Sequence, residues 1–123
     1  MDIKIIVGDK VEVMGELFDT ETARAIYDML PVEGFCNNWG DEFYFEVPLY
    51  MPPEAGATCD VEAGDIGYWP PGKAIAVFYG PTPLSRGDKP VPASEVNLIG
   101  RIKGDASVLK KGKDETFIRM EKI

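Results

Sequence analysis

The side chains that could do chemistry in this sequence are carboxylates, phenols, thiols and basic groups, because the chain contains no histidine. A Ser-His-Asp triad, a Cys-His pair, an HExxH zinc site and an imidazole pH switch are therefore excluded. Glu42 and Tyr44 lie two positions apart, so a strand would place them on one face. With Arg101 they could hold a polar head group, or exchange a proton if burial raised the pKa of Glu42. An Arg101 ion pair that only joins strands is the favoured alternative.

Metal and disulfide chemistry have little support. Asp60, Glu62 and Asp65 could offer oxygen ligands to a hard cation, but they do not follow the D-x-D-x-D-G pattern of a calcium loop. Cys36 and Cys59 lack CxxC spacing, and we expect two free thiols, with a disulfide in an oxidising compartment or a thermophile as the alternative. We therefore predict no metal and no cofactor.

The overall charge and the apolar runs restrict the partners and the location. Thirteen basic and 21 acidic residues make an acidic protein of formal net charge −8, which would repel a phosphate backbone, so no nucleic-acid partner is expected. The longest apolar run, residues 74–79, is too short to cross a bilayer, so no membrane partner is expected. The first residues lack the basic and apolar regions of a secretory signal, and a cytoplasmic location is predicted.

The elements that must position these side chains are mostly short strands. Thirteen glycines and ten prolines divide the chain into short pieces, which favours β structure in a single domain spanning residues 1–123. Only residues 20–30 have helical spacing of apolar side chains, with Asp19 or Thr20 as the cap and Pro31 at the end. We expect this helix to close an open end of a barrel.

Apolar alternation and apolar runs predict the strands. We place them at 2–7, 10–18, 42–47, 66–69, 73–79, 97–103 and 115–122, with one more near 58–61. Residues 105–112 could form a helical turn capped by Asp105. About eight strands, one main helix and a short helical turn predict a mainly β, closed antiparallel barrel, since closure removes exposed strand edges. A sandwich is the alternative.

Three segments carry more specific motifs: CNNWGDEFYF at 36–45, GDIGYWPPGKA at 64–74 and FYGPTP at 78–83. With VNLIGRI at 96–102, they resemble a small prokaryotic cyclophilin-like family of unknown function. The resemblance covers nearly the whole chain and implies an eight-stranded cyclophilin-like β-barrel capped by helices. It implies no activity, because the cyclophilin segment resembling FHRVI-x-x-FM-x-QGGD, whose arginine polarises the prolyl amide, is absent.

The turn at Trp39 and the two proline-rich corners are candidates for a ligand site at one rim of the barrel. Aromatic rings there would bury the apolar part of a ligand, and glycines at 40, 67 and 80 would let it approach the backbone. We predict that Trp39, Tyr44, Tyr68, Trp69 and Arg101 line one concave surface; the alternative is that the aromatic side chains only pack the barrel. The predicted ligand-binding residues are Asn38, Trp39, Glu42, Tyr44, Tyr68, Trp69, Thr82 and Arg101.

Three functions are compatible with these residues. The first is a binding module for a small ligand or an extended peptide, without ordinary prolyl isomerase activity. The second is an enzyme, either a divergent peptidyl-prolyl isomerase or an enzyme of small-molecule amide metabolism, because the barrel also resembles that of lactam-hydrolase and urea-carboxylate subunits. The third is a structural subunit of a homo-oligomer, with the rim as the contact.

Overall fold

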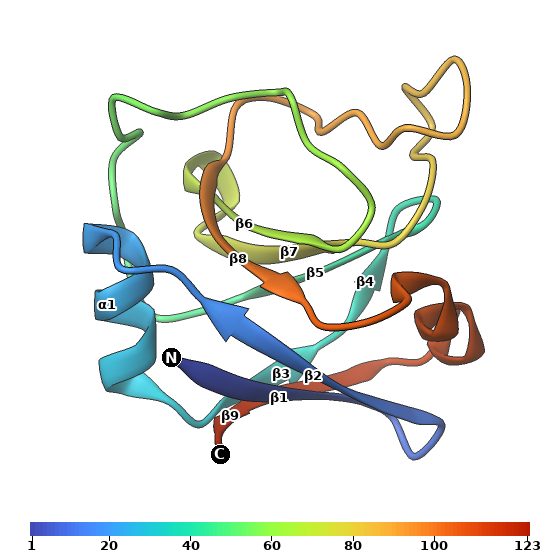
Figure 1. Ribbon diagram of the computed structural model, residues 1–123, viewed down its shortest axis with the longest axis horizontal. Helices are drawn as coiled ribbons and strands as arrows, with labels where there is room; N and C mark the ends of the chain where they lie inside the picture. Colours follow the sequence, from blue (N-terminus) through green and yellow to red (C-terminus); the bar gives the residue numbers. More distant parts are fainter.

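The computed structural model describes residues 1–123, and its main element is an antiparallel sheet that curves into a barrel (Figure 1). The strands are β1 (Asp2–Val7), β2 (Val11–Leu17), β3 (Val32–Phe35), β4 (Asn37–Asn38), β5 (Glu42–Glu46), β6 (Asp65–Trp69), β7 (Ala74–Phe78), β8 (Asn97–Ile102) and β9 (Phe117–Lys122). The helices are α1 (Glu21–Met29) and two 3₁₀ helices, η1 (Pro70–Gly72) and η2 (Ala106–Gly112).

The barrel closes at a bend in the chain. The strand order is β3-β9-β1-β2-β8-β6-β7-β5-β4. The two edge strands of this sheet, β3 and β4, are separated in the sequence by Cys36 alone. Because β3 pairs with β9 while β4 pairs with β5, this bent segment joins both ends of the sheet. Counted as one bent strand, it makes the barrel eight-stranded. The predicted mainly β, antiparallel barrel is confirmed.

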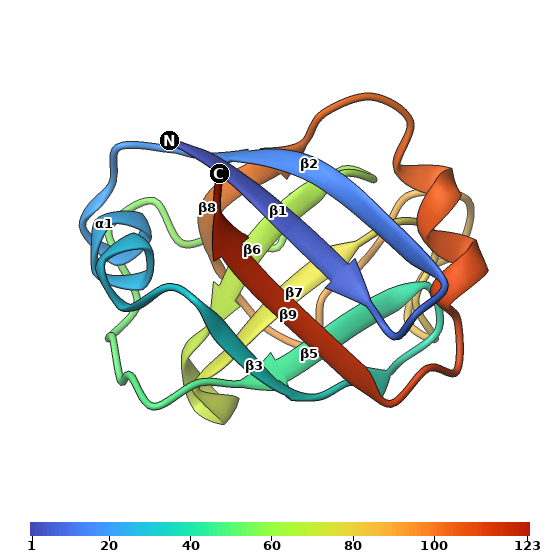
Figure 2. The ribbon, with the colours of Figure 1, turned by 90° about the horizontal axis from the view of Figure 1, so that it is seen from below.

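Helices cover the two ends of the barrel (Figure 2). Helix α1 is capped by Thr20, one of the two predicted cap residues, whose Oγ1 accepts a hydrogen bond from the Ala23 N–H at 3.1 Å. Ala23 and Ile26 are fully buried in the main core. At the opposite end, η2 buries Leu109 and is capped by Asp105, as the sequence predicts.

Two predictions about strands need correction. Residues 32–38 were not predicted to be extended, yet they form β3 and β4 by pairing with β9 and β5. The predicted strand near 58–61 is reduced to a single bridge between Thr58 and Val96. The irregular segment before this bridge is held by the Asn97 side chain. Asn97 donates from Nδ2 to the Pro52 carbonyl at 3.1 Å and accepts at Oδ1 from the Glu54 N–H at 2.8 Å.

The sheet has apolar side chains on both faces where β5, β6 and β7 lie together. Phe43, Phe45 and Val77 point into the main core, inside the barrel. Since successive strand residues point to opposite faces, the residues between them lie outside. There a second cluster forms under the segment 80–96, composed of Val61, Ala76, Phe78 and Val96 with Tyr44, Trp69 and Leu98 packed against it.

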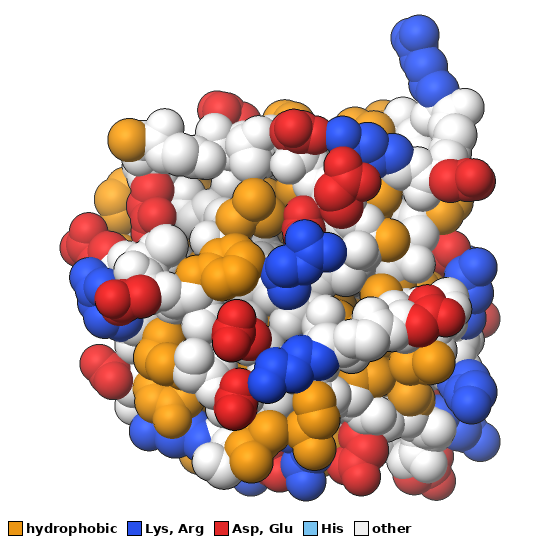
Figure 3. All heavy atoms as spheres, in the orientation of Figure 1, with side chains coloured by type: hydrophobic (Ala, Val, Ile, Leu, Met, Phe, Trp, Pro, Cys, Tyr) orange, Lys and Arg blue, Asp and Glu red, His pale blue; other side chains and the backbone are white.

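Charged side chains of both signs are interspersed over the surface shown in Figure 3. Several are paired: Arg119 contacts both Glu33 at 2.9 Å and Glu121 at 2.7 Å. No helix is long and apolar enough to cross a membrane.

Candidate functional site

A cavity of about 180 Å³ lies beside the second cluster, between the outer face of the sheet and the segment 92–96. Six of its eight lining residues are hydrophobic, so its wall is mainly apolar. They are Trp39, Glu42, Tyr44, Trp69, Phe78, Pro92, Ala93 and Val96. An apolar cavity of about 150 Å³ can hold a benzene molecule, so this one has room for a small ligand. It lies on the outer face of the sheet, not at the barrel rim where the site was predicted.

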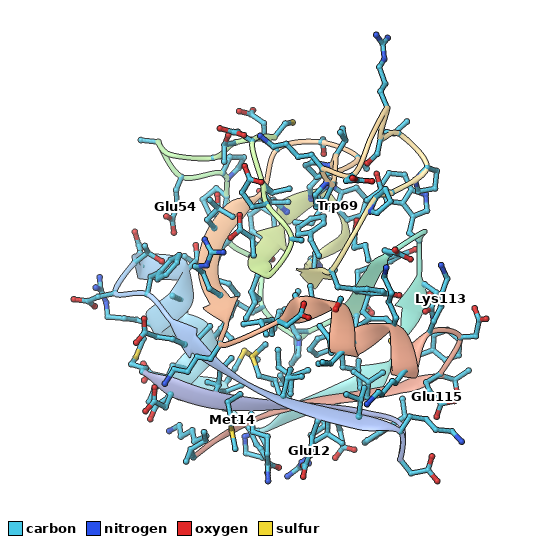
Figure 4. All side chains as sticks on the ribbon, turned by 45° about the vertical axis from the view of Figure 1, so that its right-hand side comes forward. Glu12, Met14, Glu54, Trp69, Lys113 and Glu115 are labelled. Carbon is cyan, nitrogen blue, oxygen red and sulfur yellow. The ribbon has the colours of Figure 1, made fainter.

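Trp69 is held on the cavity wall by two contacts. It is the last residue of β6, and Figure 4 shows it beneath the loop that precedes β8. Its indole N–H donates to Ser94 Oγ at 2.7 Å. The Tyr44 ring meets it edge-on, with ring centroids 6.4 Å apart and planes inclined by 69°. These two contacts fix the orientation of the indole on the cavity wall.

Trp39 is positioned by the tight turn between β4 and β5. Its backbone N–H donates to the Glu42 carbonyl at 2.9 Å, which closes the turn. Gly40 has a φ of 60°, a conformation in which a side chain is strained. A Cβ there would also lie only 2.9 Å from the Pro81 carbonyl. The turn therefore packs directly on the FYGPTP loop, and this contact joins two of the sequence motifs beside the cavity.

Glu42 is the single carboxylate on the cavity wall. It is the first residue of β5 and is 7% exposed, and its Oε1 atom is buried with no hydrogen-bond partner. Loss of water raises the pKa of Glu42 to about 8, and no neighbouring charge contributes to this shift. Near neutral pH the cavity therefore contains an uncharged carboxylic acid that can donate a hydrogen bond, or a carboxylate if a cation stabilises it.

Two of the predicted residues lie elsewhere. Tyr68 is fully buried in the main core, where its hydroxyl donates to the Leu49 carbonyl at 2.6 Å. Tyr68 and Trp69 are consecutive strand residues, so they face opposite sides of the sheet and cannot share a surface. Arg101 is on β8, which β6 and β7 separate from β5, and it lies 3.3 Å from Asp65. The prediction of one concave surface is wrong for these two residues, and Arg101 forms the strand-joining ion pair.

Asn38 and Thr82 are also absent from the cavity wall and organise the turns around it. Asn38 accepts from the Asp114 N–H at 3.0 Å and donates to the Glu115 carbonyl at 3.1 Å. Thr82 donates from Oγ1 to the Val91 carbonyl at 2.6 Å. Both side chains are engaged with the backbone of the protein itself.

The space beside two of the predicted glycines is filled by the chain itself. A Cβ on Gly67 would lie 2.9 Å from a Val96 methyl carbon, and one on Gly80 would lie 2.5 Å from Asp41 Oδ2. The lack of a side chain at these positions permits close packing between protein segments. The prediction that these two glycines open the backbone to a ligand is therefore wrong.

Four lining residues were missed: Phe78, Pro92, Ala93 and Val96. Phe78 could have been found, because it pairs with Glu42 across β5 and β7 and shares the outer face. The other three belong to or border an irregular loop that has no periodicity to predict its position.

The structure contains neither an assembled metal site nor a disulfide. No group of three Cys, Asp or Glu residues is placed to hold a metal ion. Both cysteines are free, with Cys36 buried and Cys59 exposed, and burial raises the pKa of the Cys36 thiol to about 12.

Known proteins resemble this chain over most of its length. A family model described as Cyclophilin-like matches residues 1–121. A hypothetical protein from Archaeoglobus fulgidus, known from a solution structure, is 41% identical with a TM-score of 0.81, and the match covers 100% of this chain and 95% of that one. McbB, solved in complex with tryptophan, is 16% identical with a TM-score of 0.70, and the match covers 98% of this chain and 44% of McbB. The McbB likeness extends to the fold alone, and no curated protein matches the chain.

Proposed function

The chain belongs to the cyclophilin-like family, and on this scaffold we propose that it is a binding module that holds a small ligand in the cavity between Trp39, Tyr44 and Trp69. The observation that carries the proposal is that oriented aromatic rings and one buried carboxyl group line the same apolar cavity. Ligand sites typically combine an apolar lining with a few polar groups that fix orientation. The cavity volume favours a small molecule over an extended peptide.

The unpaired oxygen of Glu42 supports this proposal. A buried polar atom without a hydrogen bond destabilises a fold by about 1–3 kcal/mol. Such atoms are rare in folded proteins and call for an explanation. Because Glu42 lines the cavity, a small ligand bound there is the available hydrogen-bond partner for its carboxyl group.

The same cavity offers little support for ordinary prolyl isomerase activity. No arginine lines it, and Arg101 lies 3.3 Å from Asp65, at the opposite end of β6 from Trp69. Without a guanidinium group to polarise the prolyl amide, we propose binding without isomerisation.

A thermal-shift screen against small metabolites tests the proposal, because a ligand that binds only the folded state raises its stability. McbB was solved with tryptophan, so that amino acid belongs in the panel. We expect at least one compound to raise the melting temperature of the wild type but not of Trp69→Ala. Phe35→Ala, which alters an exposed ring on β3, is the matched control and should respond as the wild type does. A screen without any saturable shift would overturn the proposal.

A further inference from the structure

We propose that the ligand of this cavity is a small protonated amine, whose N–H group donates to the carboxylate of Glu42 while its hydrocarbon part packs against Trp39 and Trp69. This inference rests on the proposed function, because it names the chemical class for the same cavity.

The first argument is the hydrogen-bonding capacity of Glu42. Glu42 lines the cavity, and its Oε1 atom is buried without a hydrogen-bond partner. An ionised carboxylate only accepts hydrogen bonds, so its natural partner is an N–H or O–H donor. An ammonium group offers such a donor together with the opposite charge, and charge-assisted hydrogen bonds are about twice as strong as neutral ones. A quaternary ammonium ion has no N–H group and could not donate a hydrogen bond to the carboxylate.

The second argument is the aromatic content of the wall. The cavity contains both tryptophans of the chain and one tyrosine. Indole is the best aromatic partner for a cation, and the attraction reaches about 2 kcal/mol or more when the cation is removed from water. The remaining apolar lining suits the hydrocarbon part of an amine.

The third argument is that no Lys or Arg side chain of the protein lies on this wall. Besides Glu42, the cavity is lined by aromatic and apolar side chains from the turn after β4, from β5, β6 and β7, and from the covering segment 92–96, and none of them carries a formal charge. Tyr44 is the single other titratable group among them. The neighbouring Asp41 is not on the wall and is paired with Lys113 at 2.8 Å. A ligand is therefore the available source of a countercharge for Glu42.

This arrangement gives amine binding a characteristic pH dependence. Burial raises the pKa of Glu42 to about 8 in the free protein, and an adjacent ammonium ion would lower it. Below pH 8 the amine must therefore displace a proton from Glu42, whereas the amine itself, like a lysine side chain, stays charged up to about pH 10. The affinity of the protein for the amine should therefore increase with pH, by up to about tenfold per pH unit, and level off above about pH 8. A neutral ligand that accepts a hydrogen bond from the protonated acid should instead bind more weakly above that pH.

Three probes that share a phenylethyl group test the inference: 2-phenylethylamine, 2-phenylethanol and 3-phenylpropanoate. Quenching of intrinsic tryptophan fluorescence reports binding directly, because both tryptophans line the cavity. We expect the amine to bind most tightly, with an affinity at least about tenfold higher near pH 8 than near pH 6. The carboxylate probe should bind most weakly at both pH values.

Variants of Glu42 separate its charge from the shape of the cavity. Glu42→Gln should lose at least about tenfold of the amine affinity and all of the pH dependence, while binding of the alcohol stays within about twofold. Glu42→Asp keeps the charge and should keep the pH dependence. Glu46→Gln is the matched control, since it changes an exposed carboxylate on the same strand and face, and should behave as the wild type. Thermal melting of each variant verifies that it is folded.

The outcomes distinguish this inference from the proposed function. Alcohol binding at least as tight as amine binding, with an amine affinity that does not change with pH, would refute the amine class and leave the cavity a ligand site. Failure of all three probes to bind would also overturn the inference, whereas the proposed function depends on the wider screen.

Discussion

Glu42 is the residue on which the chemistry of the cavity depends. Glu42 and Glu46 occupy the same outer face of β5, yet the first is 7% exposed and the second is exposed to solvent. Glu42 has a pKa raised to about 8 in the folded protein, against about 4.3 in an unfolded chain. Between these values the folded state keeps a proton that the unfolded state has lost. Stability must therefore fall as the pH rises through this window.

Replacement of Glu42 by Gln should remove this loss of stability. We expect the free energy of unfolding of the wild type to fall, relative to that of Glu42→Gln, by up to about 1.4 kcal/mol per pH unit between about pH 5 and pH 8. Urea denaturation at both pH values measures the difference. Glu46→Gln, the control, should follow the wild type, and parallel pH profiles for Glu42→Gln and the wild type would refute the assignment of a raised pKa to this carboxyl group.

At the scale of elements, Trp69 joins β6 to the loop that covers the cavity. It is half-buried and hydrogen-bonded to Ser94, so its removal should affect the site more than the fold. We expect Trp69→Ala to abolish ligand binding while costing less than the about 3–5 kcal/mol typical of a deleted core aromatic. Phe45→Ala, which removes a fully buried ring, should show the full cost in urea denaturation. Equal destabilisation by the two variants would make Trp69 a core residue.

Elements with regular local patterns could be predicted from the sequence. The hairpin of β1 and β2 follows from apolar alternation, and α1 from its spacing and its Thr20 cap. By contrast, β3 has the mixed sequence VEGF and is extended because it pairs with β9, more than 80 positions away at Val32 and Met120. Local propensity carries no information about such a distant partner.

The lining residues of the candidate site could be predicted only in part. The motifs correctly brought together Trp39, Glu42, Tyr44 and Trp69. Strand alternation, applied to Tyr68 and Trp69, would have removed Tyr68 from the set. The burial of Glu42 could not be predicted, because part of its cover comes from residues 92–96, which reach it only through the folded loop.

At the scale of the whole molecule, the two cysteines lie in different environments and form no disulfide across the barrel. Cys36 is buried at the bend that closes it, and Cys59 is exposed on a connecting segment. We expect a reductant to leave the urea denaturation midpoint unchanged, and thiol titration of the unfolded chain to find two free groups. A loss of about 3 kcal/mol on reduction would instead indicate a disulfide that closes the intervening loop.

The barrel shared with cyclophilins does not by itself confer their activity. We expect no acceleration of cis-trans isomerisation in a standard Xaa-Pro peptide, because no arginine lines the cavity. A protease-coupled or NMR exchange assay measures the rate. Acceleration comparable to that of an ordinary cyclophilin, abolished by a single substitution in this chain, would favour the isomerase function instead.

The central claim is that this cavity is a ligand site and that Glu42 recognises the ligand. A crystal structure of the protein with saturating 2-phenylethylamine near pH 8 tests it most directly. The account predicts the amine nitrogen within hydrogen-bond distance of a carboxylate oxygen of Glu42, about 2.7–2.9 Å for a charge-assisted bond, with the phenyl ring against Trp39 and Trp69. A cavity that remains empty under these conditions, or an amine bound at another surface, would contradict it.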